Sequence, residues 1–167
     1  MMEEYFFCNA NESDSEELLR LYQSVKKTGY CRWTQDYPGK STIEFDLSRD
    51  ALYVLKNTDG DIIGAISVDD DENVNRLNCW SNIGTSFAEL SRLVIRRDYQ
   101  NRGLACYLVR KVMDKLKEKG CRQIRYMVSK ENLVAIKSYK KLGFNRVGET
   151  VMYGDEYWCY EMTIGQV

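Results

Sequence analysis

In the segment 87–128 the spacing of apolar residues changes from that of a strand to that of a helix and back to that of a strand. This strand–helix–strand order constrains the fold more than any other feature of the chain. Runs of apolar residues at 87–95 and 123–128 predict two strands. Between them, an apolar residue recurs at every fourth position from Leu104, which predicts a helix over 103–119. A strand, a crossover helix and a second strand are typical of a parallel pair in one sheet. The chain is therefore expected to contain at least one such parallel pair.

The remaining sequence adds strands and helices on both sides of this segment. The step Asp59-Gly60 predicts a hairpin between two of the strands. The resulting order, β-α-α-β-β-β-α-β-α-β-β, indicates an α/β fold with a mixed sheet. No repeat or linker divides the sequence, so we expect one domain over 1–167. The further strands are expected at 5–8, 51–55, 62–68, 144–152 and 157–164, and the further helices at 18–25, 41–47 with Ser41 as its cap, and 132–142 with Asn132 as its cap.

Charge and composition exclude several classes of partner. The formal net charge is -1, so no general basic field would attract nucleic acid. No apolar run approaches the roughly 20 residues that a membrane-spanning helix needs. The first residues lack the basic and apolar regions of a secretory signal. We therefore expect a cytoplasmic protein without nucleic-acid or membrane partners.

The chain contains no histidine, which limits its chemistry. A hydrolase triad built on an imidazole base is excluded, and a general base must be a carboxylate, a tyrosine, a lysine, a cysteine or a relayed water. The 6 cysteines include no C-x-x-C pair, so we expect no structural metal. In a reducing compartment these cysteines would stay free.

The turn Gln100–Ala105 joins the predicted strand 87–95 to the helix 103–119. A helix N-terminus offers unpaired backbone N–H groups and a positive dipole end, so a phosphate is a natural ligand there. Gly103 and Ala105 leave the backbone accessible. The spacing Gln-x-x-Gly-x-Ala matches neither the dinucleotide fingerprint nor the P-loop. Taken alone, the turn also fits an ordinary strand-to-helix connection whose small residues serve packing.

Four stretches together carry a family resemblance: Phe87–Ile95, Tyr99–Ala105, Asn132–Tyr139 and Leu142–Phe144. In these stretches the chain resembles the GCN5-related N-acetyltransferase (GNAT) family. The resemblance implies the GNAT acyl-CoA N-acyltransferase fold, with acetyl-CoA bound between the two parallel strands and no metal cofactor.

The resemblance also implies which residues hold the cofactor. The backbone of Leu93 and Val94 would pair with the pantetheine arm, Asn132 would contact the same arm, and Tyr139 would lie near the thioester sulfur. The pyrophosphate would lie in the amides of the turn, which are those of Gln100, Asn101, Arg102, Gly103, Leu104 and Ala105.

Three residues are candidates for the chemistry of direct attack through a tetrahedral intermediate. The Val94 N–H would stabilise the oxyanion. Tyr139 matches the family's general acid, although a place in the helix core would also explain it. Glu89 is the candidate base; a structural carboxylate or a water relay are the alternatives. Strand alternation places Glu89, Ser91 and Leu93 on one face and Arg92 and Val94 on the other.

The resemblance also implies an acceptor site near the first two helices, so the segment 33–38 is a candidate for binding the amine. Trp33 and Tyr37 are candidates to wall a pocket and Asp36 to hold an amine, but the same segment would also suit a loop held in place by aromatic anchors. The acidic run 69–72 would attract a cation or simply form a solvated turn.

The sequence therefore favours one function and leaves a second open. The first is an acetyl-CoA-dependent N-acetyltransferase acting on a primary amine of a small molecule, peptide or protein. The alternative is a non-catalytic GNAT-fold module that binds or senses acyl-CoA. An O-acyl acceptor or a longer acyl group would be variants of the enzyme. The chain is expected to be a monomer or a homodimer.

Overall fold

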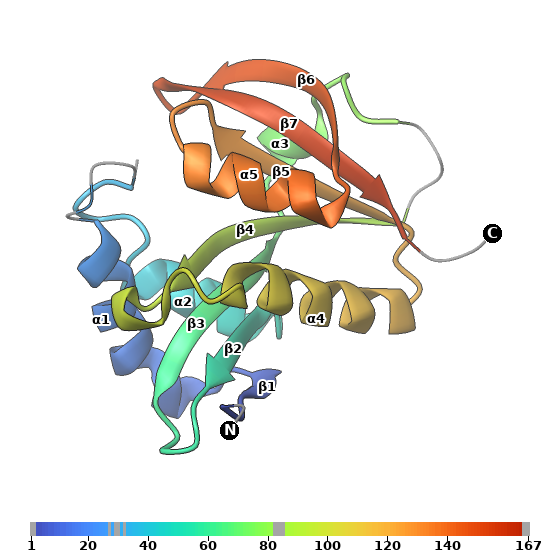
Figure 1. Ribbon diagram of the computed structural model, residues 1–167. Helices are drawn as coiled ribbons and strands as arrows, with labels where there is room; N and C mark the ends of the chain where they lie inside the picture. The colour runs from blue at the N-terminus through green and yellow to red at the C-terminus, as the bar shows by residue number, and fades with distance from the viewer. Residues whose placement is uncertain (1–2, 27, 29–30, 32, 82–85, 165–167) are drawn as a thin grey trace. The chain divides into compact units, whose positions relative to one another are not determined.

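A computed structural model describes residues 3–26, 28, 31, 33–81 and 86–164 of the chain (Figure 1). Two units can be distinguished by their internal contacts. Unit 1 comprises Met1–Val68 and Arg92–Lys111, and unit 2 comprises Asp69–Ser91 and Val112–Val167. The boundaries between the units fall inside two strands and one long helix. Each unit is described separately below.

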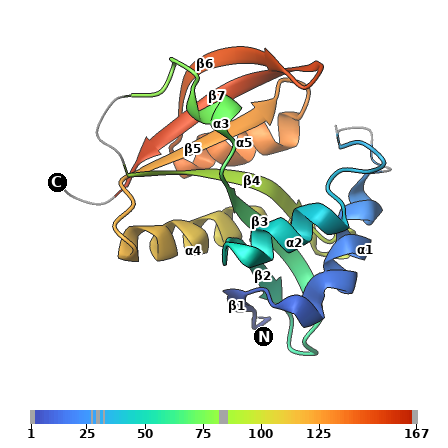
Figure 2. The ribbon, with the colours of Figure 1, turned by 180° about the vertical axis from the view of Figure 1, so that it is seen from behind.

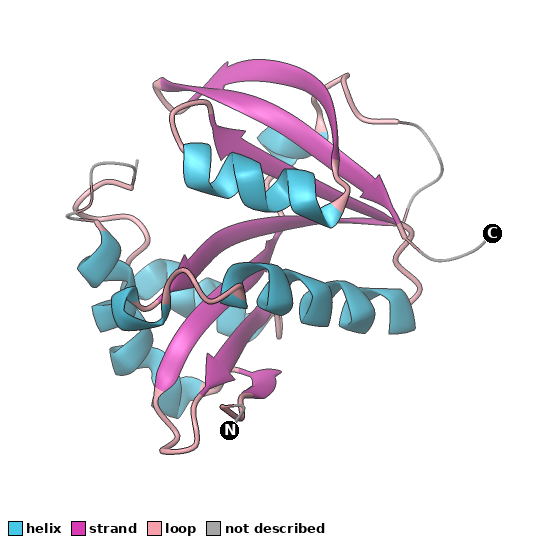
Figure 3. Cartoon of the chain, viewed as in Figure 1, coloured by secondary structure: helices cyan, strands magenta, loops and turns pink. Residues whose placement is uncertain are grey.

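The described residues form a mixed sheet of seven strands in the order β1-β2-β3-β4-β5-β7-β6 (Figure 3). β4 and β5 are parallel, as the crossover helix predicted, whereas β1, β2 and β3 pair in antiparallel order, as do β5, β7 and β6. The bounds are β1 Phe6–Asn9, β2 Leu52–Lys56, β3 Ile62–Asp69, β4 Phe87–Ile95, β5 Gln123–Ser129, β6 Asn145–Met152 and β7 Asp155–Thr163. The predicted strand order and sheet type are confirmed.

The helices also follow the predicted order, with three short additions. The predicted ones are α1 Ser15–Val25, α2 Lys40–Ser48, α4 Leu104–Glu118 and α5 Leu133–Leu142. The sequence did not predict the short helix α3, Glu72–Asn75, or the 3-10 turns Glu12–Asp14 and Arg97–Tyr99.

The predicted cap of α2 was wrong. The helix begins one residue earlier than expected, and Gly39 rather than Ser41 is its N-cap. The Thr42 hydroxyl accepts a hydrogen bond from the Gly39 N–H at 3.2 Å, which fixes the start of the helix.

In unit 1, helices cover both sides of the strands. Figures 1 and 2 show α1 and α2 on one side of β2 and β3 and the first half of α4 on the other. Successive side chains of β2 and β3 therefore point alternately toward α1 and α2 and toward α4. Those of Leu52, Val54 and Ala65 lie in one buried cluster with α1 and α2. On the opposite side, a Cβ added to Gly64 would lie 3.4 Å from a Leu108 methyl, so α4 packs close to β3.

Unit 2 has the same layered organisation around β5, β7 and β6. α5 lies on one face of these strands and α3 on the other (Figure 2). Tyr126 and Tyr160 are cross-strand partners, and both rings contact the ring of Tyr139 from α5. The next cross-strand pair includes Cys159, which is fully buried with residues of the α3 side such as Trp80.

The turn between β2 and β3 is held by one buried amide. The Asn57 side-chain oxygen accepts from the N–H groups of Asp59 and Asp61, at 3.0 and 2.9 Å. Its amide nitrogen donates to the Tyr99 hydroxyl at 3.1 Å, in the segment that leads to the predicted phosphate turn. Gly60, at φ +84°, completes this hairpin turn, which confirms the signal of the Asp-Gly step.

Substitution of Asn57 by alanine is expected to destabilise the protein by about 1–3 kcal/mol, because three hydrogen-bonding groups lose their partner. Urea unfolding measures the change in the free energy of unfolding. Asp59→Ala is the control, since the Asp59 side chain is exposed, and it should stay within about 0.5 kcal/mol of wild type. Equal values for the two variants would contradict the structural role of the Asn57 amide.

Candidate active site

The turn after β4 has the geometry of an anion site at a helix N-terminus. Gly103 lies at φ +76°, and its carbonyl accepts the Tyr107 N–H at 3.1 Å. The amides of Leu104 and Ala105 therefore precede the first hydrogen bond of α4. A Cβ built on Gly103 would meet no heavy atom within 4 Å in the described structure. The space above the turn is thus open, as the approach of a phosphate requires.

The side chains of the turn are already positioned by the protein. Gln100 donates its side-chain amide to the Ile95 carbonyl at 3.0 Å and so ties the turn to the end of β4. Arg102 donates to the Asp98 carbonyl at 3.1 Å and to the Glu3 carboxylate at 2.9 Å. The exposed Asn101 lies at φ +63°. The Arg102 side chain is 48% exposed, so its charge remains accessible to a second anion.

β4 contains a residue in the left-handed region, Arg92 at φ +52°. In unit 1 the side chains of Arg92 and Val94 both lie on the side of α1 and α2, as strand alternation predicted. Arg92 contacts Asp46 of α2, and Val94 belongs to the cluster that includes Ile43. Val94 is buried, whereas Leu93 is half-buried.

Glu89 lies in the part of β4 that belongs to unit 2 and is only 5% exposed. It is in register with Arg125 on the parallel neighbour β5, so the two side chains share a face. The Arg125 guanidinium lies 3.8 Å from the centroid of Phe87 and donates to Gln123 at 2.6 Å. Burial lowers the pKa of Arg125, and the charge of Glu161, with smaller contributions from Cys79 and Glu89, opposes part of this shift. A buried carboxylate next to a cation fits either a base or a structural charge.

Tyr139 is fully buried in an aromatic cluster of unit 2. Its ring centroid lies 4.0 Å from that of Tyr126, 5.9 Å from that of Phe144 and 6.4 Å from that of Tyr160. Burial raises the pKa of the Tyr126 phenol, and a hydrogen bond with the Tyr139 side chain lowers this pKa by a smaller amount. The core-packing role of Tyr139 is therefore present in the structure.

Asn132 is the N-cap of α5, as the sequence predicted. Its side-chain oxygen accepts from the Ala135 N–H at 3.1 Å. The side chain is half-buried, and this capping contact uses one of its hydrogen-bonding groups.

The two aromatic residues of the predicted acceptor segment are anchored in unit 1. Trp33 packs edge-on against Tyr22, with 5.5 Å between the ring centroids. The Tyr37 hydroxyl accepts a hydrogen bond from Arg92 at 2.8 Å, although the residue is 42% exposed. Asp36 is exposed. The interpretation of this segment as an aromatic-anchored loop therefore has direct support, and Tyr37 and Asp36 still present surface to solvent.

Sequence reasoning missed two features of the polar structure. One is the buried carboxylate Asp46, whose signal was an acidic residue one turn after Ile43 on the apolar face of α2. The other is the role of the acidic run. Asp71 caps α3 by accepting from the Asn73 N–H at 3.0 Å, and it also accepts from the Tyr153 hydroxyl. This part of the run therefore forms a capped turn.

The described residues contain no membrane-spanning helix, no cluster of metal ligands and no disulfide. No helix there is long and apolar enough to cross a membrane. No three His, Cys, Asp or Glu side chains in the described ranges come together as metal ligands. The six cysteines, all of which lie in those ranges, are free thiols.

A model of the family described as "Acetyltransferase (GNAT) family" matches residues 16–144. The chain belongs to the acetyltransferase (GNAT) family. The match includes the turn Gln100–Ala105, the Asn132 cap and Tyr139. The family resemblance drawn from the sequence is confirmed.

Two curated GNAT relatives are each 26% identical to the chain. One is an uncharacterized N-acetyltransferase, MJ1207 of Methanocaldococcus jannaschii, aligned over 86% of this chain and 62% of its own length. The other is the β-lysine N(6)-acetyltransferase of Methanococcus maripaludis, aligned over 85% of this chain and 46% of its own length. The chain thus spans less than two thirds of the length of these relatives.

Among solved structures, YncA of Salmonella typhimurium, determined with its cofactor acetyl-CoA, has the same fold. The TM-score is 0.75 at 15% identity, with 98% of this chain and 96% of that chain covered. The expected GNAT fold is therefore confirmed.

Proposed function

We propose that this GNAT chain is an acetyl-CoA-dependent N-acetyltransferase that acetylates a primary amine. The observation that carries the proposal is the open N-terminal end of α4, where Gly103 leaves the backbone amides of the turn accessible. In an acetyltransferase family, an anion site at this position suits the pyrophosphate of coenzyme A.

The residues present suit such a ligand. The amides of Leu104 and Ala105 would hold the pyrophosphate, and the half-exposed guanidinium of Arg102 would add a charged donor. Gln100 and Asn101 would shape the turn, since the Gln100 side chain is bonded to the Ile95 carbonyl. Asn132 in unit 2 would contact the pantetheine arm.

Acetyl-CoA supplies an activated acetyl thioester and a thiol leaving group. In our proposal the backbone of Leu93 and Val94 aligns the thioester, and the Val94 N–H donates to the carbonyl oxygen as it gains negative charge. The Tyr139 hydroxyl delivers a proton to the departing sulfur, and the amine loses a proton to a base. One N–C bond forms and one C–S bond breaks, so the products are an amide and free coenzyme A.

Glu89 is the proposed base because it is a buried carboxylate on the same strand as Val94. A carboxylate can accept the proton of the ammonium directly or through a water. Arg125, in register with Glu89 on β5, is the cation beside it. A relayed water is the alternative, and it would leave Glu89 as the structural partner of this arginine.

We propose a small amine as the first acceptor to test, since one relative is a β-lysine N(6)-acetyltransferase. A peptide or protein amino group is the second. The competing function is a non-catalytic acyl-CoA sensor, for which the anchoring of Trp33 and Tyr37 in unit 1 would be purely structural.

A panel of acceptors tests the proposal. Release of coenzyme A from acetyl-CoA is measured with β-lysine, L-lysine, 1,4-diaminobutane, tyramine, an alanyl peptide and an alcohol, after subtraction of the rate without acceptor. Mass spectrometry identifies the acetylated product, and propionyl-CoA tests the acyl group. We expect at least one amine to be turned over. Tight binding of coenzyme A without turnover of any acceptor would support the sensor.

Replacement of Gly103 by leucine should weaken coenzyme A binding at least about tenfold, because the side chain occupies the space of the phosphate; this corresponds to about 1.4 kcal/mol. Gly60→Leu is a matched control, since Gly60 also has a positive φ, +84°, and open space around it. Both variants carry a similar backbone strain of about 1–2 kcal/mol. Calorimetric titration should show weakened binding in Gly103→Leu alone; equal affinities would refute the pyrophosphate assignment.

Substitution of Glu89 by glutamine should lower kcat/KM by about 100-fold near pH 7, the order expected for loss of a general base. The loss should shrink as the pH approaches the pKa of an alkylamine, about 10.4, because the amine then needs less help to lose its proton. The pH–rate profile gives the measurement, and Glu118→Gln, at a 72% exposed side chain, is the control. A profile unchanged in Glu89→Gln would favour the water relay.

A further inference from the structure

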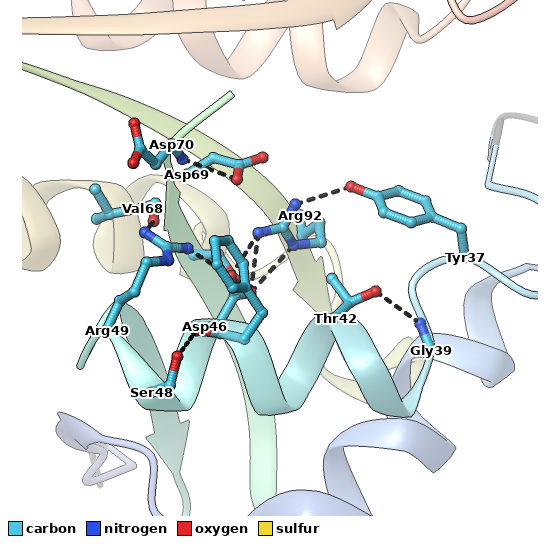
Figure 4. A network of polar contacts seen from close by, with 12 residues as sticks. Tyr37, Gly39, Thr42, Asp46, Ser48, Arg49, Val68, Asp69, Asp70 and Arg92 are labelled. Atoms are coloured by element: carbon cyan, nitrogen blue, oxygen red, sulfur yellow. Dashed lines mark hydrogen bonds and ion pairs between the residues drawn. The ribbon is translucent and has the colours of Figure 1, made fainter. Parts of the chain in front are cut away.

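A buried ion-pair network joins α2, β3 and β4 within unit 1 (Figure 4). Asp46 has no exposed surface. Its carboxylate accepts from Arg92 Nη2 at 2.9 Å on both oxygens, from Arg49 at 2.8 Å and from the Ser67 hydroxyl at 2.7 Å. A buried carboxylate is tolerated only when it is paired and hydrogen-bonded, so this network defines where Arg92 lies.

Arg92 also determines the path of β4. It is a non-glycine residue at φ +52°, which is unfavourable for an L-residue unless other contacts hold it. The contacts with Asp46 supply that support, and the Arg92 side chain is only 3% exposed. The next two residues are Leu93 and Val94, which the proposed function assigns to the thioester. The ion pair therefore sets the backbone orientation directly before them.

The same guanidinium holds the segment 33–38. Arg92 Nη1 donates to the Tyr37 hydroxyl at 2.8 Å, and the Arg92 Cζ lies 6.0 Å from the centroid of the Tyr37 ring. Figure 4 shows Tyr37 extending from its loop toward Arg92, with Asp46 on the other side of the guanidinium. One planar group therefore contacts the loop and the helix α2 at once.

A second contact strengthens this link. Trp33 of the same segment packs on Tyr22. Tyr22 lies in the same buried cluster as Val94 of β4, and Trp33 packs against this cluster. Both aromatic residues of the segment are thus tied to the surroundings of Arg92.

We propose that Arg92 is a positioning residue that couples the acceptor segment 33–38 to the backbone of Leu93 and Val94. The inference rests on the proposed function, because it assigns the segment to acceptor binding and the strand to the thioester. It gives Arg92 two roles. Its hydrogen bond with Tyr37 sets the affinity for the acceptor, and its ion pair with Asp46 sets the alignment of β4.

The chain offers a matched control at Arg49. This residue donates to the same Asp46 carboxylate and also to the Val68 carbonyl, at 3.0 Å. Arg49 lies next to the end of α2, outside β4, and the structure records no bond from it to Tyr37. Its loss should therefore weaken the protein without uncoupling the segment from the strand.

Tyr37→Phe, Arg92→Lys and Arg49→Lys are compared with the amine from the panel that is turned over fastest. Tyr37→Phe should raise the KM for the amine about tenfold, the effect expected for loss of a hydrogen bond to a charged group, with kcat and coenzyme A affinity nearly unchanged. Arg92→Lys should raise KM and also lower kcat, because lysine lacks the planar fork. Arg49→Lys should lower Tm and leave the KM for the amine and kcat unchanged. An unchanged KM in Tyr37→Phe would overturn the proposal.

Hydrogen exchange provides a readout that needs no acceptor. The exchange of the amides in 93–95 is measured in the three variants with coenzyme A absent. Faster exchange of these amides and of those in 33–37 in Arg92→Lys, but not in Arg49→Lys, supports the coupling even if no amine is turned over, an outcome that would contradict the proposed function alone. Equal exchange in Arg92→Lys and wild type would contradict the coupling itself.

Discussion

Parallel pairing of β4 with β5 is the constraint on which the rest of the structure depends. Parallel neighbours need a crossover, and here the crossover is α4. The chain must therefore turn from the carboxyl end of a strand directly into the amino end of a helix. That turn concentrates backbone N–H groups at one place, and Gly103 with its positive φ keeps them uncovered. The topology alone thus produces a helix N-terminus at which an anion site can form, and the residues of the turn keep that end open.

Features with a local cause were predictable from the sequence. β4 begins and ends at the predicted residues, and Gly60 and Asn132 act as the predicted turn and cap residues, because their signals lie within a few positions of their effects. The family resemblance extended the prediction to the phosphate turn. Asn132 and Tyr139 were assigned from the same resemblance, and their contacts with a cofactor stay predictions.

Features that depend on distant contacts were not predictable. Asp46 and Arg92 are far apart in the sequence, and nothing near either residue indicates that they pair bidentately in the core. The left-handed conformation of Arg92 is not one that its own propensity favours, so the sequence gives no sign of it. The cap of α2 was missed for a smaller reason: the Thr42 hydroxyl supports Gly39, so the helix starts before the serine that looked like its cap.

The contact between Glu3 and Arg102 has an electrostatic consequence for the turn that begins α4. It places a carboxylate on the guanidinium next to Gly103, and the Tyr5 hydroxyl donates to the same carboxylate at 2.9 Å. The charge of Glu3 therefore offsets part of the positive field that Arg102 and the helix N-terminus present to an anion. Both side chains are nearly half exposed, so dissolved salt screens the pair and changes the balance of these opposing charges.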